Sequence, residues 1–125
     1  MLNVRLTTKD VLPTKMRYVA AQQFKCAICS TPITAGPDSC LDHEHSTGLV
    51  RGALCRNCNG IEGKVKNLAT RAKRDGTWDW WLDRLLAYVR FHRANPGNII
   101  HPTHKTEDEK RLRRNKLARQ RRTTK

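Results

Sequence analysis

Two pairs of cysteines, each with the spacing C-x-x-C, constrain the fold of this chain more than any other feature. The pairs are Cys26 with Cys29 and Cys55 with Cys58. Each pair directs two thiolates to one point, and together they supply the four ligands of a tetrahedral Zn²⁺ site. Disulfides are disfavoured in the reducing compartment that we expect, and redox chemistry needs only one such pair. We therefore predict a structural zinc site, with the remaining Cys40 packed as a small side chain.

The apolar content of the chain is low for a domain that folds on its hydrophobic core alone. Of 125 residues, 38% are hydrophobic and 6% aromatic, which predicts one small domain with a limited core. Domains of this size often need a metal or a second subunit to become stable. Between the two cysteine pairs, residues 31–54 are rich in Pro, Gly, Ser and Thr, which favours turns and a hairpin over a helix.

Hydrophobic periodicity predicts three helices outside this segment. The first begins after Thr14 as N-cap and ends where Lys25 starts a different pattern, and the second runs from about Gly60 to about Asp75. The third is capped by Thr77 and carries the widest apolar stripe. We interpret this stripe as core, part of which could face a second subunit. Its members are Trp78, Trp81, Leu82, Leu85, Leu86 and Val89.

Positive charge is concentrated at the C-terminal end of the chain. Lys and Arg number 25 against 11 Asp and Glu, a net charge of +14, and residues 105–125 hold ten of the basic side chains and three of the acidic ones. Such an excess favours a polyanionic partner, of which nucleic acid is the commonest. We divide the chain into a domain, 1–104, and a basic tail, 105–125, that is disordered or becomes helical on contact with phosphates. A tail that only increases solubility is the alternative.

No part of the sequence indicates a membrane or secreted protein. No apolar stretch approaches the roughly 20 residues that a membrane-spanning helix requires, and residues 1–10 lack the hydrophobic run of a secretion signal. We expect a cytoplasmic protein with no membrane partner and no small-molecule substrate.

The segment between the cysteine pairs carries the densest group of metal-binding side chains. Residues 41–45 read Leu-Asp-His-Glu-His, and Asn59 and Glu62 follow the second pair. Carboxylate and amide oxygens at this density favour a hard metal ion. If 41–45 is extended, its side chains alternate, which separates Asp42 from His43. A catalytic pair of these two residues would therefore need a twist or a β-bulge at this point.

Asn59 and Glu62 also have a structural interpretation. Asn at an N-cap with Glu three residues later is a capping-box pattern, which would start the second helix at Asn59. Both roles could coexist, because zinc bound to Cys58 would hold the backbone one residue earlier.

These residues resemble the recombination endonuclease VII family of phage junction-resolving nucleases, a branch of the His-Me finger (HNH-like, ββα-metal) superfamily. The resemblance covers roughly residues 14–104. It is carried by the four paired cysteines together with Leu-Asp-His-Glu-His at 41–45, Val-Arg-Gly-Ala-Leu-Cys at 50–55, Cys-Asn at 58–59 and Glu-Gly-Lys at 62–64. It continues downstream to Asn-Ile-Ile-His-Pro at 98–102.

The resemblance implies a mainly α fold with a small β-hairpin, a zinc-stapled ββα-metal nuclease fold. It implies that Asp42 and Asn59 bind a catalytic Mg²⁺ or Mn²⁺ ion, that His43 is the general base and that Glu62 is an accessory acidic residue near the metal. The implied ligands of the structural zinc are Cys26, Cys29, Cys55 and Cys58.

Two neighbouring residues receive no definite role from the resemblance. Related sequences have a second Asp between the two histidines, whereas this chain has Glu44. His45 could orient the site, contact phosphate or be structural.

The implied activity is that of a metal-dependent endonuclease that hydrolyses phosphodiester bonds in branched DNA such as Holliday junctions. The implied assembly is a homodimer, located in the host cytoplasm if a phage encodes the chain. An HNH-type nicking or homing endonuclease acting on ordinary duplex DNA is the nearest alternative. A zinc-ribbon protein that binds nucleic acid without catalysis is the other, although a pure binder gains nothing from an acidic residue such as Asp42 beside phosphate.

Overall fold

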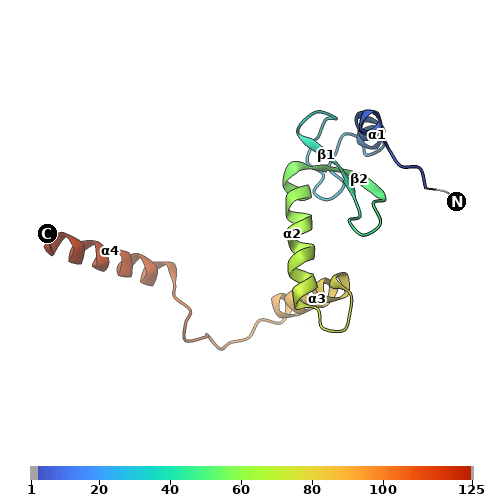
Figure 1. The fold of residues 1–125 in the computed structure, drawn as a ribbon. Helices are drawn as coiled ribbons and strands as arrows, with labels where there is room; N and C mark the ends of the chain where they lie inside the picture. The colour runs from blue at the N-terminus through green and yellow to red at the C-terminus, as the bar shows by residue number, and fades with distance from the viewer. Residues whose placement is uncertain (1–2, 125) are drawn as a thin grey trace. The chain divides into compact units, whose positions relative to one another are not determined.

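A computed structural model describes residues 3–124, which form four helices and one two-stranded sheet (Figure 1). The elements are α1 (Thr8–Ala21), β1 (Ser39–His43), β2 (Val50–Cys55), α2 (Arg56–Ala72), α3 (Trp78–Ala94) and α4 (Glu107–Thr123). This mainly helical fold with one hairpin confirms the predicted fold class. The chain divides into two compact units, the first ending at Leu86 and the second beginning at Ala87. No helix in the described part of the chain is long and apolar enough to cross a membrane.

Helix α1 begins earlier than the sequence predicts, because a local carboxylate caps it. The Asp10 carboxylate accepts hydrogen bonds from the Thr7 N–H at 2.8 Å and from the Thr7 hydroxyl at 2.6 Å. Thr14, the predicted N-cap, lies inside the helix after Pro13 and is buried. The prediction was wrong because Thr7 and Asp10 form an equally local capping pair farther upstream, so the helix has already begun at Thr8.

Strands β1 and β2 form the antiparallel hairpin that the composition of this segment predicts. Asp42 pairs with Gly52, and the register then shifts so that His43 pairs with Val50. Arg51 is therefore an extra residue on β2, as in a β-bulge. This register shift lies between Asp42 and His43, where we expected that a catalytic pair of these two residues would need a twist or a β-bulge.

A small core forms where α1 and α2 pack against the hairpin. Its buried members are Val19, Cys26, Ile33, Ala53 and Leu54, with Tyr18, Ala35, Cys55 and Cys58 partly buried against them. Three of these nine residues are predicted zinc ligands. The limited hydrophobic core and the cysteine cluster are therefore one structural unit.

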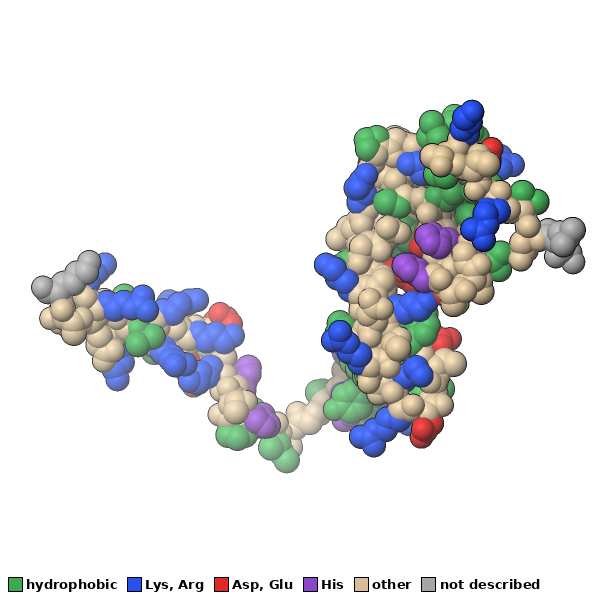
Figure 2. All heavy atoms as spheres, viewed as in Figure 1, with side chains coloured by type: hydrophobic (Ala, Val, Ile, Leu, Met, Phe, Trp, Pro, Cys, Tyr) green, Lys and Arg blue, Asp and Glu red, His purple; other side chains and the backbone are tan. Residues whose placement is uncertain are grey.

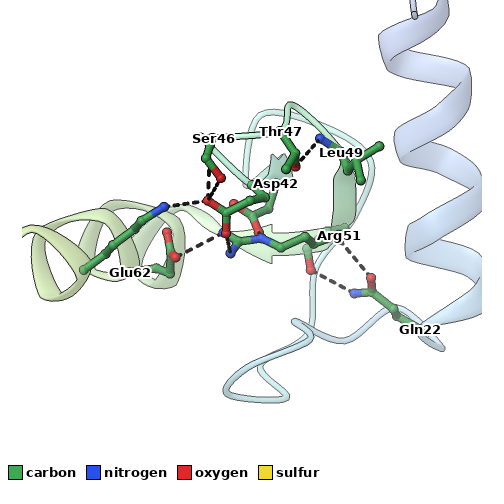
Figure 3. A network of polar contacts seen from close by, with 10 residues as sticks. Gln22, Asp42, Ser46, Thr47, Leu49, Arg51 and Glu62 are labelled. Carbon is green, nitrogen blue, oxygen red and sulfur yellow. Dashed lines mark hydrogen bonds and ion pairs between the residues drawn. The ribbon is translucent and has the colours of Figure 1, made fainter. Parts of the chain in front are cut away.

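The Gln22 side chain, just after α1, pairs with β2 as a neighbouring strand would. Its amide donates a hydrogen bond to the Ala53 carbonyl at 2.8 Å and accepts one from the Ala53 N–H at 2.8 Å (Figure 3). Gly52 permits this approach, because a Cβ at that position would lie 3.0 Å from Gln22 Oε1. The contact thus holds the end of α1 against the hairpin.

Helix α2 begins at Arg56, directly after β2, and its N-cap is Cys55. The Cys58 N–H donates to Cys55 Sγ at 3.4 Å. Asn59 is therefore the fourth residue of the helix, and its interpretation with Glu62 as a capping box was wrong. The sulfur of Cys55 caps the helix, four residues before the predicted cap at Asn59.

Helix α3 has the predicted cap, but its apolar stripe is not buried within one chain. Thr77 Oγ1 accepts a hydrogen bond from the Trp80 N–H at 3.3 Å. None of the α3 residues is buried in the described structure. Of the stripe, Leu85, Leu86 and Val89 are 39%, 47% and 39% exposed, and Trp78, Trp81 and Leu82 are half-buried. The interpretation of the stripe as core was therefore wrong for the single chain. Its contact with a second subunit stays a prediction.

Helix α4 occupies most of the basic tail. The Thr106 N–H donates to the Glu109 carboxylate at 2.8 Å, and the Glu109 N–H donates to Thr106 Oγ1 at 3.2 Å. Most of the tail is thus helical, whereas residues 105–125 were expected to be disordered or to become helical on contact with phosphates. That phosphates induce the helix stays a prediction. The division of the chain after residue 104 stays a prediction from charge.

Candidate active site

The four paired cysteines meet in one cluster. The sulfur atoms of Cys26, Cys29, Cys55 and Cys58 all lie within 4.8 Å of one another, and Cys29 Sγ is 3.9 Å from Cys55 Sγ. Ligands bound to a tetrahedral Zn²⁺ with Zn–S distances of about 2.3 Å are about 3.8 Å apart. The spacing and the donor set therefore fit zinc. Cys40 is half-buried on β1 and lies outside the cluster.

The backbone around the cysteine pairs is shaped to hold this cluster. Ser30 follows Cys29 with a φ of 62°, and its N–H donates to the Cys26 carbonyl at 3.0 Å. This left-handed residue turns the chain back on itself after the first pair. The Cys55 N–H donates to Cys26 Sγ at 3.3 Å and so joins the two pairs.

At these distances, the ionisation of one thiol affects the pKa of its neighbours. The Thr31 hydroxyl lies 3.2 Å from Cys29 Sγ and lowers the pKa of Cys29 to about 6. The neighbouring sulfurs of Cys29 and Cys55 raise the pKa of Cys58 to about 12. A dication bound among the four sulfurs would counteract this effect, because it stabilises every thiolate at once.

A second cluster, of charged side chains, surrounds Arg51, the bulge residue of β2 (Figure 3). Arg51 Nε donates to Asp42 Oδ2 at 2.7 Å and Nη2 donates to Asp42 Oδ1 at 3.1 Å, a bidentate pair. The same Nη2 lies 3.1 Å from Glu62 Oε1, and Nη1 lies 3.3 Å from Glu44 Oε2. One guanidinium thus joins carboxylates from β1, the hairpin turn and α2.

Lys66 of α2 is the second cation of this Arg51 cluster, with Nζ 2.5 Å from Glu44 Oε1. The hydrogen bond from Lys66 and that from the Ser46 N–H lower the pKa of Glu44 to about 2, so this carboxylate is ionised at neutral pH. Hydrogen bonding to Asp42 raises the pKa of Arg51 above its ordinary value. Three carboxylates against two cations leave the cluster with a net charge of −1.

The Arg51 cluster retains oxygen donors for a hard cation. Asp42 is 7% exposed, and each of its oxygens accepts from Arg51. A carboxylate oxygen has two lone pairs, so each oxygen keeps one for a metal ion. Oxygen donors with a residual negative charge are what Mg²⁺ and Mn²⁺ prefer. In donor chemistry, the residues present fit the expected catalytic metal.

His43 lies beside a groove rather than in the Arg51 cluster. It is exposed and lines an open groove between the N-terminal segment, α1 and the hairpin turn, together with Arg5 and Arg17. Its ring is stacked on that of His45, with the ring centroids 5.3 Å apart. Within residues 3–124, no hydrogen bond joins the side chains of His43 and Asp42. The imidazole therefore remains free to meet a substrate in a positively charged groove.

Asn59 lies on α2 and is half-buried. It precedes Glu62 by three residues, so the two side chains share a face of the helix. The structure thus brings Asp42 and Glu62 together through Arg51 and places Asn59 one turn from Glu62.

A comparison with known families agrees with this geometry. The family model of recombination endonuclease VII matches residues 4–90, which include the four-cysteine cluster, the hairpin and α2. The chain belongs to the recombination endonuclease VII family. This protein is therefore a nuclease, a hydrolase, and membership of a recombination endonuclease family implies that it binds DNA.

Two residues at the centre of this endonuclease's charged cluster received no role from the sequence. Arg51 is the single charged residue in the strand Val-Arg-Gly-Ala-Leu-Cys, and a lone charge in an apolar strand could have indicated a buried partner. Lys66 follows Glu62 by four residues, the spacing of neighbours on one helix face. Neither pattern identifies the partner, because the Arg51–Asp42 pair depends on the register of the hairpin and the Lys66–Glu44 pair on how α2 packs against it.

Replacing Arg51 by glutamine should destabilise the endonuclease, because the buried Asp42 carboxylate loses its bidentate partner. Breaking a buried ion pair costs about 3–5 kcal/mol. Since the Arg51 side chain is 34% exposed, we expect the free energy of unfolding to fall by about 1–3 kcal/mol. Urea denaturation measures this change. Arg71→Gln, at an exposed position in the last turn of α2, is the matched control, and equal stability of both variants would contradict a structural role for Arg51.

Proposed function

We propose that this family member is a metal-dependent endonuclease that cuts branched DNA, such as Holliday junctions, as a homodimer. One observation carries the proposal. Asp42 from β1 and Glu62 from α2 converge on Arg51, within the part of the chain that matches the nuclease family. Such a cluster of carboxylates has no use in a protein that only binds phosphates.

In this proposal, Asp42 and Asn59 hold a Mg²⁺ or Mn²⁺ ion, with Glu62 as an accessory acidic residue. When bound, the ion would polarise the phosphate and stabilise the charge on the leaving 3′ oxygen. The ion pairs with Arg51 hold the carboxylates of Asp42 and Glu62 close together.

His43 is the proposed general base. Its imidazole accepts a proton from a water molecule, whose oxygen attacks the phosphorus atom as the bond to the 3′ oxygen breaks. The products carry a 5′-phosphate and a 3′-hydroxyl. Arg5 and Arg17 line the same groove as His43 and supply positive charge for the DNA backbone.

The exposed apolar residues of α3 support the homodimer. Leu85, Leu86 and Val89 recur at three- and four-residue intervals and are 39%, 47% and 39% exposed. Apolar patches that remain exposed in one chain commonly mark subunit interfaces. Two copies related by a twofold axis would present two active sites, one for each of two opposing strands in a branched DNA.

Cleavage of a four-way junction and of a linear duplex with matched sequence tests the proposal. We expect cleavage only with added Mg²⁺ or Mn²⁺, and on the junction a rate higher by on the order of 10-fold or more. Equal rates on both substrates would favour a nicking or homing endonuclease that acts on duplex DNA. Metal-independent binding with no cleavage of either substrate would favour a zinc-ribbon protein without catalysis.

A further inference from the structure

We infer that α4 presents a basic face that binds the phosphate backbone of duplex DNA. The nuclease-family match ends at residue 90, whereas α4 begins at Glu107, so this surface is additional to the family's domain. The inference goes beyond the proposed function and rests on it only for the choice of DNA as the polyanion.

Helix α4 is specified by its own residues rather than by packing. None of its side chains is buried. Its first turn has a capping box and three acidic residues, and Arg121 and Arg122 lie in its last turn, an order of charges that complements the helix dipole. Lys110 Nζ lies 2.7 Å from Glu107 Oε1 as one of two pairs at i, i+3. A helix that forms without burying an apolar face leaves its whole surface for a partner.

Five of the eight basic residues of α4 lie on one side of the helix. At 100° per residue, these five fall within about one third of the circumference. Glu107, in the first turn, lies at the centre of that arc, and Ala118 lies within it between the two halves of the row. We call this row the basic face, and it consists of Lys110, Arg111, Arg114, Arg121 and Arg122. Figure 2 shows Lys and Arg side chains over much of the visible surface of α4.

The other basic residues of α4, Arg113, Lys116 and Arg119, lie outside this face. Within residues 3–124, ion pairs involve only Lys110 and Arg111 among the basic residues of α4. Those two pairs are highly exposed, and such pairs contribute little stability. Phosphates can therefore replace Glu107 and Asp108 as partners at low cost.

The composition of α4 favours DNA over an anionic membrane or a protein groove. Membrane-surface helices and groove-binding helices need a continuous apolar face. The two large apolar residues of α4, Leu112 and Leu117, are five residues apart and lie on different sides of the helix, 63% and 45% exposed. Seventeen residues give a helix about 25 Å long, and a duplex carries about 15 phosphates over that length.

Two triple variants with the same change of charge test the basic face. The first is Arg114→Gln, Arg121→Gln and Arg122→Gln, and the control is Arg113→Gln, Lys116→Gln and Arg119→Gln. Full-length protein binds a labelled linear duplex without divalent metal, over a series of salt concentrations. We expect the first variant to reduce the slope of log K against log salt by about 2.7 and to weaken binding more than about 10-fold at 0.1 M salt. We expect the control to change both values much less.

Each outcome of this comparison decides the inference. Equal losses of DNA affinity and of salt slope in the two triple variants would show that the net charge of α4, and not its arrangement on one face, determines binding. That result would contradict the inference. Wild-type binding by the first variant would overturn a role of α4 in DNA binding. Loss of binding to phosphatidylserine vesicles but not to DNA would assign the face to membranes instead. Because no metal is present, none of these results depends on whether the protein cleaves junctions.

A third variant, Ala118→Pro, tests whether DNA binding requires the helical conformation of α4 as well as its positive charge. Proline at this position removes a backbone donor and breaks the helix without changing the net charge. We expect a reduced salt slope and a lower helix content by circular dichroism. An unchanged slope with a broken helix would overturn the requirement for a helical face. Circular dichroism of the two triple variants should match the wild type, because glutamine is a good helix former and α4 buries nothing.

Discussion

His43→Ala should slow single-turnover cleavage of a four-way junction on the order of 10²- to 10⁴-fold, the usual contribution of a positioned general base. Because His43 is exposed and lines an open groove, its loss should leave the fold, the zinc content and DNA binding nearly unchanged. Binding of Mn²⁺, measured directly, should also be retained, since His43 is not one of the proposed ligands, Asp42 and Asn59. His104→Ala removes an exposed imidazole outside the family match and is the control.

Asp42→Asn should abolish cleavage by a different route. It removes the anionic ligand, so the affinity for Mn²⁺ should fall together with the rate. It also leaves the Arg51 guanidinium with a neutral partner, and a modest loss of stability should accompany it. Wild-type cleavage rates in both His43→Ala and Asp42→Asn would contradict the nuclease role of this site. A rate loss in His43→Ala with an equal loss of metal binding would show that His43 is a ligand instead of the base.

Cys26→Ser or Cys58→Ser should unfold much of the first unit. Zinc binding at such sites contributes on the order of 10 kcal/mol, which equals the whole stability of a typical domain. Cys26 is also 2% exposed within the small core, so core packing and metal binding are lost together. Zinc content by atomic absorption and thermal unfolding by circular dichroism should decrease in parallel.

Cys40→Ser is the matched control for the zinc variants, because Cys40 lies on β1 outside the cluster. We expect it to keep one zinc ion per chain and a near wild-type Tm. A Cys26→Ser or Cys58→Ser protein that lost zinc but kept full stability would show that the cluster has another purpose. After denaturation and removal of the metal, zinc-dependent refolding of Cys40→Ser but not of the other two variants would support the assignment of the four ligands.

Sequence reasoning succeeded where short-range chemistry decides the structure. The spacing of Cys26 with Cys29, and of Cys55 with Cys58, predicts a cluster that the structure confirms. The turn-forming residues between the pairs predict the hairpin, and Thr77 predicts the start of α3. Each of these signals acts over a few residues, so no knowledge of the rest of the fold is needed.

The same reasoning failed where two local signals competed. Pro13-Thr14 and Asn59 with Glu62 are both acceptable helix starts, yet α1 begins after Thr7 and α2 begins after Cys55. In α1 an equally local capping pair lies farther upstream. In α2 the cap is a sulfur of the cysteine cluster, whose position depends on Cys26 and Cys29 from a distant segment.

By itself, then, the amino-acid sequence predicted the four-cysteine cluster, the hairpin and the helix after it, and the basic C-terminal segment. It also named Asp42, His43, Asn59 and Glu62 as candidates, whose catalytic roles stay predictions. Tertiary structure alone decided how those candidates are arranged. Arg51 becomes the common partner of Asp42, Glu44 and Glu62 only because a register shift leaves it as the extra residue of β2. The physical reason is that pairing of charges depends on distance in space, and residues 42 and 62 approach each other only after the hairpin has packed against α2.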